Sequence, residues 1–252
     1  MSDFTRGLPE LGNSARRPLP EDDATIEALP HDVRARIAEG WVKRSEAEFS
    51  AGAVFASITR GLFFEDVPRE VLWLAARAVT DEIRHGELCL FAANRYSGIV
   101  HQRPKALVSN EARGGALIHA VVNGAINETI ATAFLNASFE AATSPFARAI
   151  LRELLADEVD HARVGWAVLA DGSPKGAEIR AETEKHLSAL VDMVRTIWID
   201  SARAAPNDLP REHGCIPGRD VMKIVDEALV EIVFPGFAHV GIDPSPLSRL
   251  LG

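Results

Sequence analysis

Apolar residues recur along most of the chain at alternating steps of three and four positions, the spacing that places them on one face of an α-helix. These stripes predict helices over residues 31–64, 68–97, 111–142, 145–170, 176–204 and 220–233. No segment alternates with the period of two that marks a half-buried β-strand. The sequence therefore predicts an all-α protein.

The predicted helices are flanked by segments of different composition. Residues 1–30 are polar and proline-containing, which predicts an N-terminal arm that is poorly ordered or lies on the surface. Residues 31–205 are expected to form a helical bundle with a fifth helix. The connection over residues 98–110 can span on the order of 40 Å, enough to return the length of a helix. Residues 206–252 are expected to form a loop, a short helix and an irregular tail that begins at Pro235.

Charge and composition exclude several kinds of partner. The net charge is -9 with both signs scattered along the chain, which argues against a nucleic-acid partner. No apolar run reaches the about 18 residues that a membrane span requires, and the first 30 residues lack the apolar centre of a signal peptide. Two cysteines, Cys89 and Cys215, are too few for a disulfide framework. We therefore expect a cytoplasmic protein without a membrane partner.

Two of the apolar stripes contain the same charged pair. Glu82 and His85 interrupt one stripe, and Glu158 and His161 interrupt another, each pair with the spacing E-x-x-H. On a helix this spacing directs both side chains from one face, here the face toward the core. A single such pair is usually a surface pair or a capped core histidine. Two buried pairs instead indicate a cation between them, because burying these groups without one is costly.

Two further glutamates are predicted to face the same interior. In the first helix Glu48 lies seven residues from Trp41 and seven from Phe55, which places all three on the buried side. In the third helix Glu128 shares a face with apolar residues. Each glutamate lies on the first helix of a predicted hairpin, and one E-x-x-H pair lies on the second. The six predicted metal ligands are Glu48, Glu82, His85, Glu128, Glu158 and His161.

This set resembles that of the ferritin-like di-iron carboxylate proteins, over roughly residues 40–170. Residues 81–85 follow the D-E-x-R-H form of di-iron oxygenases, and residues 48–55 with Trp41 resemble an uncharacterised bacterial ferritin-like group. The resemblance implies a four-helix bundle with a long crossover. It also implies a cofactor of two iron ions, with Mn/Fe or Mn/Mn pairs as alternatives. A site rich in carboxylates with two nitrogen ligands suits iron or manganese better than zinc.

Charged neighbours are expected to support the ligands. Asp81 and Asp157 each precede a histidine by four positions, and metal-bound histidines normally donate their second N–H to a carboxylate. In a bundle whose two halves are related by a pseudo-twofold axis, each aspartate faces the other half. We therefore predict crossed partners, with Asp81 on His161 and Asp157 on His85. The alternative is that both aspartates cap exposed turns. Arg84 is expected to pair with a nearby acid and not to bind metal.

Small residues predict a substrate pocket on one side of the metals. Gly52, Ala78, Gly124 and Gly165 each lie one turn to that side of a ligand, and Phe55, Val121 and Val168 would form the walls. The alternative is close helix packing, which small residues serve equally well.

Two other polar side chains are candidates for the site. Thr132 could hydrogen-bond a ligand that bridges the metals, or it could bond its own backbone. His186 is a candidate for an extra metal ligand.

Function follows from the resemblance and from elimination. Two cysteines cannot form the four-cysteine iron site of rubrerythrins, and Tyr96 lies about 16 Å along the helix from His85, too far for the radical of the usual ribonucleotide reductases. We expect an oxidase or monooxygenase that uses dioxygen on a small organic substrate, with an external electron donor. A ferroxidase or iron-handling protein is the alternative, and metal binding without turnover is a third. The arm and residues 206–252 could cover a bundle end or form a homodimer interface.

Overall fold

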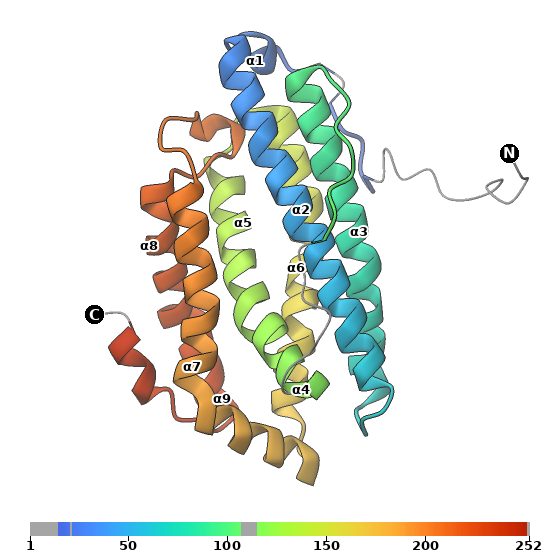
Figure 1. Cartoon of the computed structure of the whole chain (residues 1–252), viewed down its shortest axis with the longest axis vertical. Helices are drawn as coiled ribbons and strands as arrows, with labels where there is room; N and C mark the ends of the chain where they lie inside the picture. Colours follow the sequence, from blue (N-terminus) through green and yellow to red (C-terminus); the bar gives the residue numbers. More distant parts are fainter. Residues whose placement is uncertain (1–14, 21, 107–114, 251–252) are drawn as a thin grey trace, which may run out of the picture.

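The structure is a computed structural model that describes residues 15–20, 22–106 and 115–250 (Figure 1). The helical segments are α1 (Ala24–Glu27), α2 (His31–Leu62), α3 (Arg69–Ser97), α4 (Gly115–Ala120), η2 (Val121–Glu128), α5 (Thr129–Ala141), α6 (Pro145–Ala170), α7 (Pro174–Ala204), η3 (Arg211–His213), α8 (Gly218–Ala228), η4 (Leu229–Val233), α9 (Phe234–His239) and η5 (Ser245–Leu250). These described ranges contain no β-strand, which confirms the all-α prediction for them.

Local sequence determines where the long helices begin and end. Ser144 caps the start of α6 by accepting a hydrogen bond from the backbone N–H of Ala147, and Ser173 does the same for α7. In both helices a proline occupies the first turn, where its missing N–H costs nothing. Helix α3 ends at Gly98, whose φ of 75° lies in the left-handed region that glycine adopts most readily.

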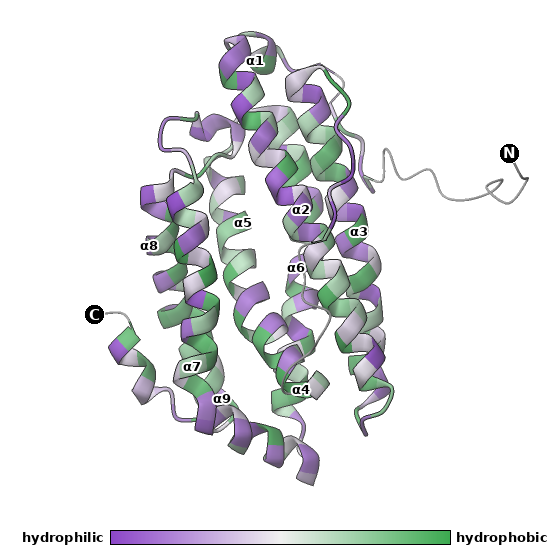
Figure 2. Cartoon of the chain, in the orientation of Figure 1, coloured by the Kyte–Doolittle hydropathy of each residue, from purple (hydrophilic) through white to green (hydrophobic). Residues whose placement is uncertain are grey.

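The helices pack as two hairpins. Helix α2 lies along α3, and the segment from α4 to α5 lies along α6 (Figure 1). The hairpins meet where α3 contacts α6 and where α2 contacts α4. Helices α7 and α8 lie on the other side of α5 from α2 and α3 (Figure 1). Hydrophilic residues recur along α2, α3 and α7, and no helix in the described ranges is both long and apolar enough to cross a membrane (Figure 2).

Two apolar cores lie one above the other along the bundle. The first contains residues after Glu48 in α2, before Glu82 in α3 and after His161 in α6, for example Phe55, Ala75 and Val168. The second contains residues on the opposite side of those positions, such as Trp41, Leu88 and Leu154. The polar positions that the two cores flank therefore form one buried layer between them.

The third long helix differs from its prediction. Its expected first residues, 111–114, lie outside the described residues. The remainder is interrupted by the π-helical segment η2, which ends at Glu128. A π-helix inserts extra backbone into a helix and is frequent at functional sites. The apolar periodicity did not reveal this π-helical segment, because the apolar residues before it and those after it each keep the spacing of an α-helix.

The C-terminal segment is more regular than the predicted tail. The helix that begins at Gly218 continues through η4 and α9 to His239, so the prediction of an irregular chain from Pro235 is wrong. Pro235 is the second residue of α9, directly after the π-helical segment η4. Val225, Leu229 and Phe237 are fully buried in the first core, so this segment completes the core of the bundle.

The described part of the N-terminal arm is attached to the bundle through Asp23. One carboxylate oxygen accepts from the Thr25 backbone N–H and hydroxyl, and the other accepts from the Ser144 hydroxyl at 2.6 Å and the Phe146 backbone N–H at 3.0 Å. Burial opposes ionisation, yet these hydrogen bonds lower the pKa of Asp23 to about 2. The arm is thus tied to the N-terminus of α6.

Replacing Asp23 tests this attachment. Asp23→Asn should lower the free energy of unfolding at pH 7 by about 2 kcal/mol, because the ionised carboxylate is the favoured acceptor. Since the folded pKa lies below the unfolded value of 3.8, the difference should hold above about pH 4 and shrink as the pH falls toward 2. Denaturant unfolding at several pH values measures it. Asp22→Asn, on the exposed neighbour, is the matched control, and equal stability of the two variants would contradict the assignment.

Candidate metal centre

The six predicted ligands converge in the polar layer between the cores. Helix α2 contributes one glutamate, the end of η2 contributes another, and α3 and α6 each contribute a glutamate and a histidine. All six are buried, namely Glu48, Glu82, His85, Glu128, Glu158 and His161. The structure therefore buries the six side chains that helical periodicity placed on inward faces.

Glu82 and Glu158 lie between the two histidines. Nδ1 of His85 is 3.2 Å from one oxygen of Glu158, and Nδ1 of His161 is 3.4 Å from the other. Glu82 has the same relation, with one oxygen 3.0 Å from Nδ1 of His161 and the other 3.8 Å from Nδ1 of His85. The imidazole ring centroids are 5.6 Å apart. Each of these two carboxylates thus directs one oxygen toward each histidine.

The remaining glutamates lie on opposite sides of this centre. Glu48 groups with His85 and Glu158, and Glu128 groups with His161, Glu82 and Glu158. Within each group the nearest ligand atoms lie within 4.8 Å of one another. Each of these buried groups could hold a metal ion, because carboxylate oxygens and imidazole nitrogens are common metal ligands.

The hydrogen bonding of the centre fits a cation. Nδ1 of both histidines, both carboxylate oxygens of Glu82 and Oε1 of Glu158 are buried and make no hydrogen bond of good geometry within the described residues. Leaving a buried polar atom unsatisfied costs about 1–3 kcal/mol, and more when the group is charged. A cation at the centre would satisfy all of these atoms together. The donor set therefore fits a metal ion.

The electrostatics of the centre point the same way. Burial, and then the charges of Glu82 and Glu158, raise the pKa of Glu48 and of Glu128 well above the ordinary value. Burial alone would lower the pKa of His85, but the adjacent carboxylates of Asp157 and Glu158 raise it to about 10. The centre therefore favours positive charge among its carboxylates.

Asp157 and Asp81 face the outer nitrogens of the histidines. Nε2 of His85 lies 3.4 Å from Asp157, and Nε2 of His161 lies 3.7 Å from Asp81. This is the crossed arrangement expected from the sequence. Both aspartates are buried, since Asp81 is 4% and Asp157 1% exposed, so they do not cap exposed turns. On His85, a proton held on Nε2 by Asp157 would leave Nδ1 available to a cation at the centre. Nε2 of His161 faces Asp81 at a distance beyond that of a hydrogen bond.

Arginines surround the two aspartates. Arg84 contacts Asp157 and also lies 3.4 Å from Glu153, so it has the ion-pairing role expected of it. Arg77 pairs with Asp81 at 3.1 Å and with Asp157 at 3.0 Å. Its position four residues before Asp81 is a signal that the sequence carries but that the motif search overlooked. Arg16 of the arm also reaches both aspartates, and no local pattern could have revealed it.

The predicted substrate pocket is not formed at its glycines. A Cβ added to Gly124 would lie 2.5 Å from the backbone nitrogen of Gly165, and one added to Gly165 would meet the backbone of Ala125 even more closely. A Cβ at Gly52 would lie 3.2 Å from that of Glu82. These glycines let helix backbones touch, so the alternative of close packing holds for them.

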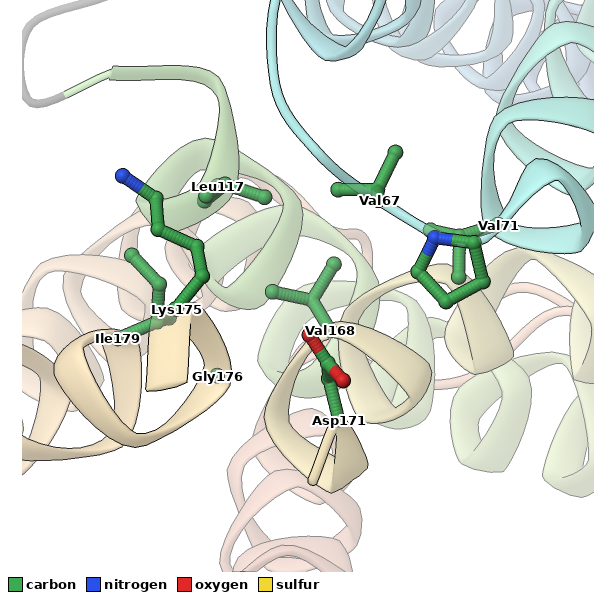
Figure 3. Close-up of a pocket in the computed structure, with 9 residues that line it drawn as sticks. Val67, Val71, Leu117, Val168, Asp171, Lys175, Gly176 and Ile179 are labelled. Carbon is green, nitrogen blue, oxygen red and sulfur yellow. The ribbon is translucent and has the colours of Figure 1, made fainter. Parts of the chain in front are cut away.

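The other predicted pocket residues lie in the first apolar core. Phe55, Ala78 and Val121 are fully buried there, and the Phe55 ring lies 5.7 Å from that of His161. Val168 borders a cavity at the end of the bundle together with Val71 and residues of α4 and α7 (Figure 3). Its volume of about 10 Å³ holds roughly one water molecule. This cavity is too small for an organic substrate.

Thr132 and His186 do not contribute to the centre. The Thr132 hydroxyl donates to the backbone carbonyl of Glu128 at 2.7 Å, as helix threonines often do. The His186 side chain is 48% exposed and pairs with Glu182 at 3.1 Å on the outer face of α7. The alternative in which Thr132 bonds its own backbone therefore holds, and the prediction of His186 as an extra ligand is wrong in this structure.

Comparisons with known proteins leave the family open. The chain matches no family model, and neither a search of curated proteins nor one of solved structures finds a match.

The packing of Gly165 against η2 can be tested by adding a methyl group. Gly165→Ala should lower the free energy of unfolding by about 2 kcal/mol, because the new Cβ meets backbone that cannot move aside. Gly40→Ala is the matched control. Nothing lies within 4 Å of a Cβ at Gly40 in α2, so this change should stabilise the protein by about 0.5–1 kcal/mol. Thermal unfolding compares them, and a harmless Gly165→Ala would contradict the close contact.

Proposed function

We propose that the six buried ligands hold two metal ions, with Glu82 and Glu158 bridging them. One ion would be bound by His85 and Glu48, and the other by His161 and Glu128. The observation that carries this proposal is the sharing of carboxylates. Each of Glu82 and Glu158 directs one oxygen toward each histidine, as a bridge requires.

The donor set favours iron. Four carboxylates and two imidazoles form a hard, oxygen-rich set, whereas zinc prefers four-coordinate sites with fewer oxygens. One glutamate from each of two helices and an E-x-x-H pair from each of two others is the arrangement of ferritin-like di-iron and di-manganese proteins. This arrangement supports the proposal that the chain is similar to that group, with an iron pair as the cofactor and Mn/Fe or Mn/Mn as alternatives.

The proposed activity is the oxidation of a substrate by dioxygen. A bound iron pair would supply the two electrons that dioxygen takes up in the first reduction step. The residues of this chain would hold the ions and orient both imidazoles through Asp81 and Asp157. The two apolar cores would keep bulk water from the centre. Two cysteines cannot form a four-cysteine electron-transfer site, so an external electron donor would complete the cycle.

The closed packing favours a second candidate. Gly124 and Gly165 are in backbone contact where an organic substrate was expected, and Phe55 covers one side of His161. Dioxygen and ferrous iron are small enough to reach such a centre without a preformed pocket. Ferroxidation, in which iron itself is the substrate, is therefore the alternative to an oxidase or monooxygenase.

Anaerobic ferrous titration of the metal-free protein tests the proposed site. The wild type should bind two ions per chain. Glu158→Ala should bind neither ion tightly, because it removes ligand atoms from both positions. Glu48→Ala should keep the ion beside His161 and lose the other. Glu46→Ala, two residues earlier in α2 and outside the six ligands, is the control and should bind two. A wild type that binds no iron would contradict the proposal.

Admitting oxygen to the loaded protein separates the two candidate activities. An oxidase or monooxygenase should keep two iron ions per chain and consume oxygen repeatedly only with an added reductant. A ferroxidase should consume oxygen in proportion to the ferrous iron supplied and accumulate ferric iron beyond two ions per chain. An oxygen electrode and iron analysis measure both quantities. No oxygen uptake by the loaded protein would contradict both activities.

A further inference from the structure

Arg16, in the N-terminal arm, lies over the outer side of the metal centre. Its two terminal nitrogens contact different aspartates, Asp157 at 2.6 Å and Asp81 at 2.8 Å. Its backbone N–H donates to Glu153 at 2.7 Å, and the next residue, Arg17, pairs with the same glutamate at 3.0 Å. One guanidinium thus joins α3 to α6 through the two carboxylates that face the histidines.

The contacts of Arg16 divide the oxygens of both aspartates in the same way. On each aspartate Arg16 takes Oδ1, and Oδ2 is the oxygen that faces the imidazole. A carboxylate held at one oxygen cannot turn, so its second oxygen stays directed at the histidine. A planar guanidinium suits this task because its two nitrogens lie at a fixed separation.

The neighbouring arginines reproduce only part of this contact. Arg84 pairs with Asp157, and Arg77 meets Asp157 at Oδ1 and Asp81 at Oδ2, the oxygen that also faces His161. Among the described residues Arg16 is the one partner of Asp81 Oδ1. Of the three arginines that contact the aspartates in the described part of the chain, Arg16 is also the one outside the helices that carry the ligands.

The arm can hold Arg16 in place because it packs against the second apolar core. Asp23 and the fully buried Ile26 attach the arm to the bundle a few residues later, and the intervening Pro18 and Pro20 restrict the backbone between them. The Arg16 side chain is 48% exposed, whereas the side chains of Asp81 and Asp157 are 5% and 1% exposed. Arg16 is therefore the outermost layer of the centre, and we expect its loss to leave the helix packing intact.

We propose that Arg16 is a positioning residue for both metal ions. By holding Oδ1 of Asp81 and of Asp157, it orients the two aspartates, which orient His161 and His85. Metal affinity at both positions then depends on the docked arm. This inference rests on the proposed function, because it requires that the two histidines bind metal.

Cobalt(II) titration under anaerobic conditions tests the proposal, with the visible absorption spectrum as the readout. Arg16→Ala should bind Co²⁺ about tenfold more weakly at both positions, the lower end of the effect of losing an outer partner of a metal-bound histidine. The spectrum should change, because the imidazoles are no longer held in one orientation. Arg16→Lys should recover only part of the affinity, since one ammonium cannot hold both Oδ1 atoms. The thermal midpoint of the metal-free protein should stay close to that of the wild type.

Arg203→Ala is the matched control, because this arginine forms an exposed pair on α7. It should leave affinity and spectrum unchanged. The proposal is overturned if Arg16→Ala binds Co²⁺ with the affinity and spectrum of the wild type, or if Arg203→Ala weakens binding equally. These outcomes differ from failure of the proposed function, in which the wild type itself binds no Co²⁺.

Discussion

The burial of four carboxylates and two imidazoles in one layer is the constraint on which the rest of the structure depends. Apolar cores on both sides of this layer exclude water and strengthen every charge within it. Burial, and then the neighbouring glutamate charges, raise the pKa of Glu48 and of Glu128, so these groups need a compensating positive charge if all are to ionise. The fold is therefore arranged to supply positive charge at the centre, through protons on the histidines or through the cations that we propose.

Packing determines how closely the ligands approach. Gly124 in η2 and Gly165 in α6 bring two backbones into contact one turn from Glu128 and His161. A side chain at either glycine would separate the helices and with them the two ligands. The same contact fills the space in which a substrate was expected. Close approach of the ligands and an open pocket on that side exclude each other.

Much of the fold and of the candidate site could be predicted from local spacing. Helical periodicity placed Glu48 and Glu128 inward, and the expected pairing of two similar helical hairpins predicted which aspartate faces which histidine. Contacts made by segments without helical periodicity could not be predicted. Arg16 lies 65 residues from Asp81 and 141 from Asp157, in a segment without periodicity. The roles of Gly52, Gly124 and Gly165 were also undecided, because small residues serve packing and pockets alike.

Anomalous X-ray scattering from crystals of the iron-loaded protein, recorded at the iron edge, is the most direct test of the central claim. The account predicts two peaks between Glu82 and Glu158, one beside Nδ1 of His85 and the other beside Nδ1 of His161. A map with no peak among the six ligands, or with a single peak that contacts only one histidine, would contradict it.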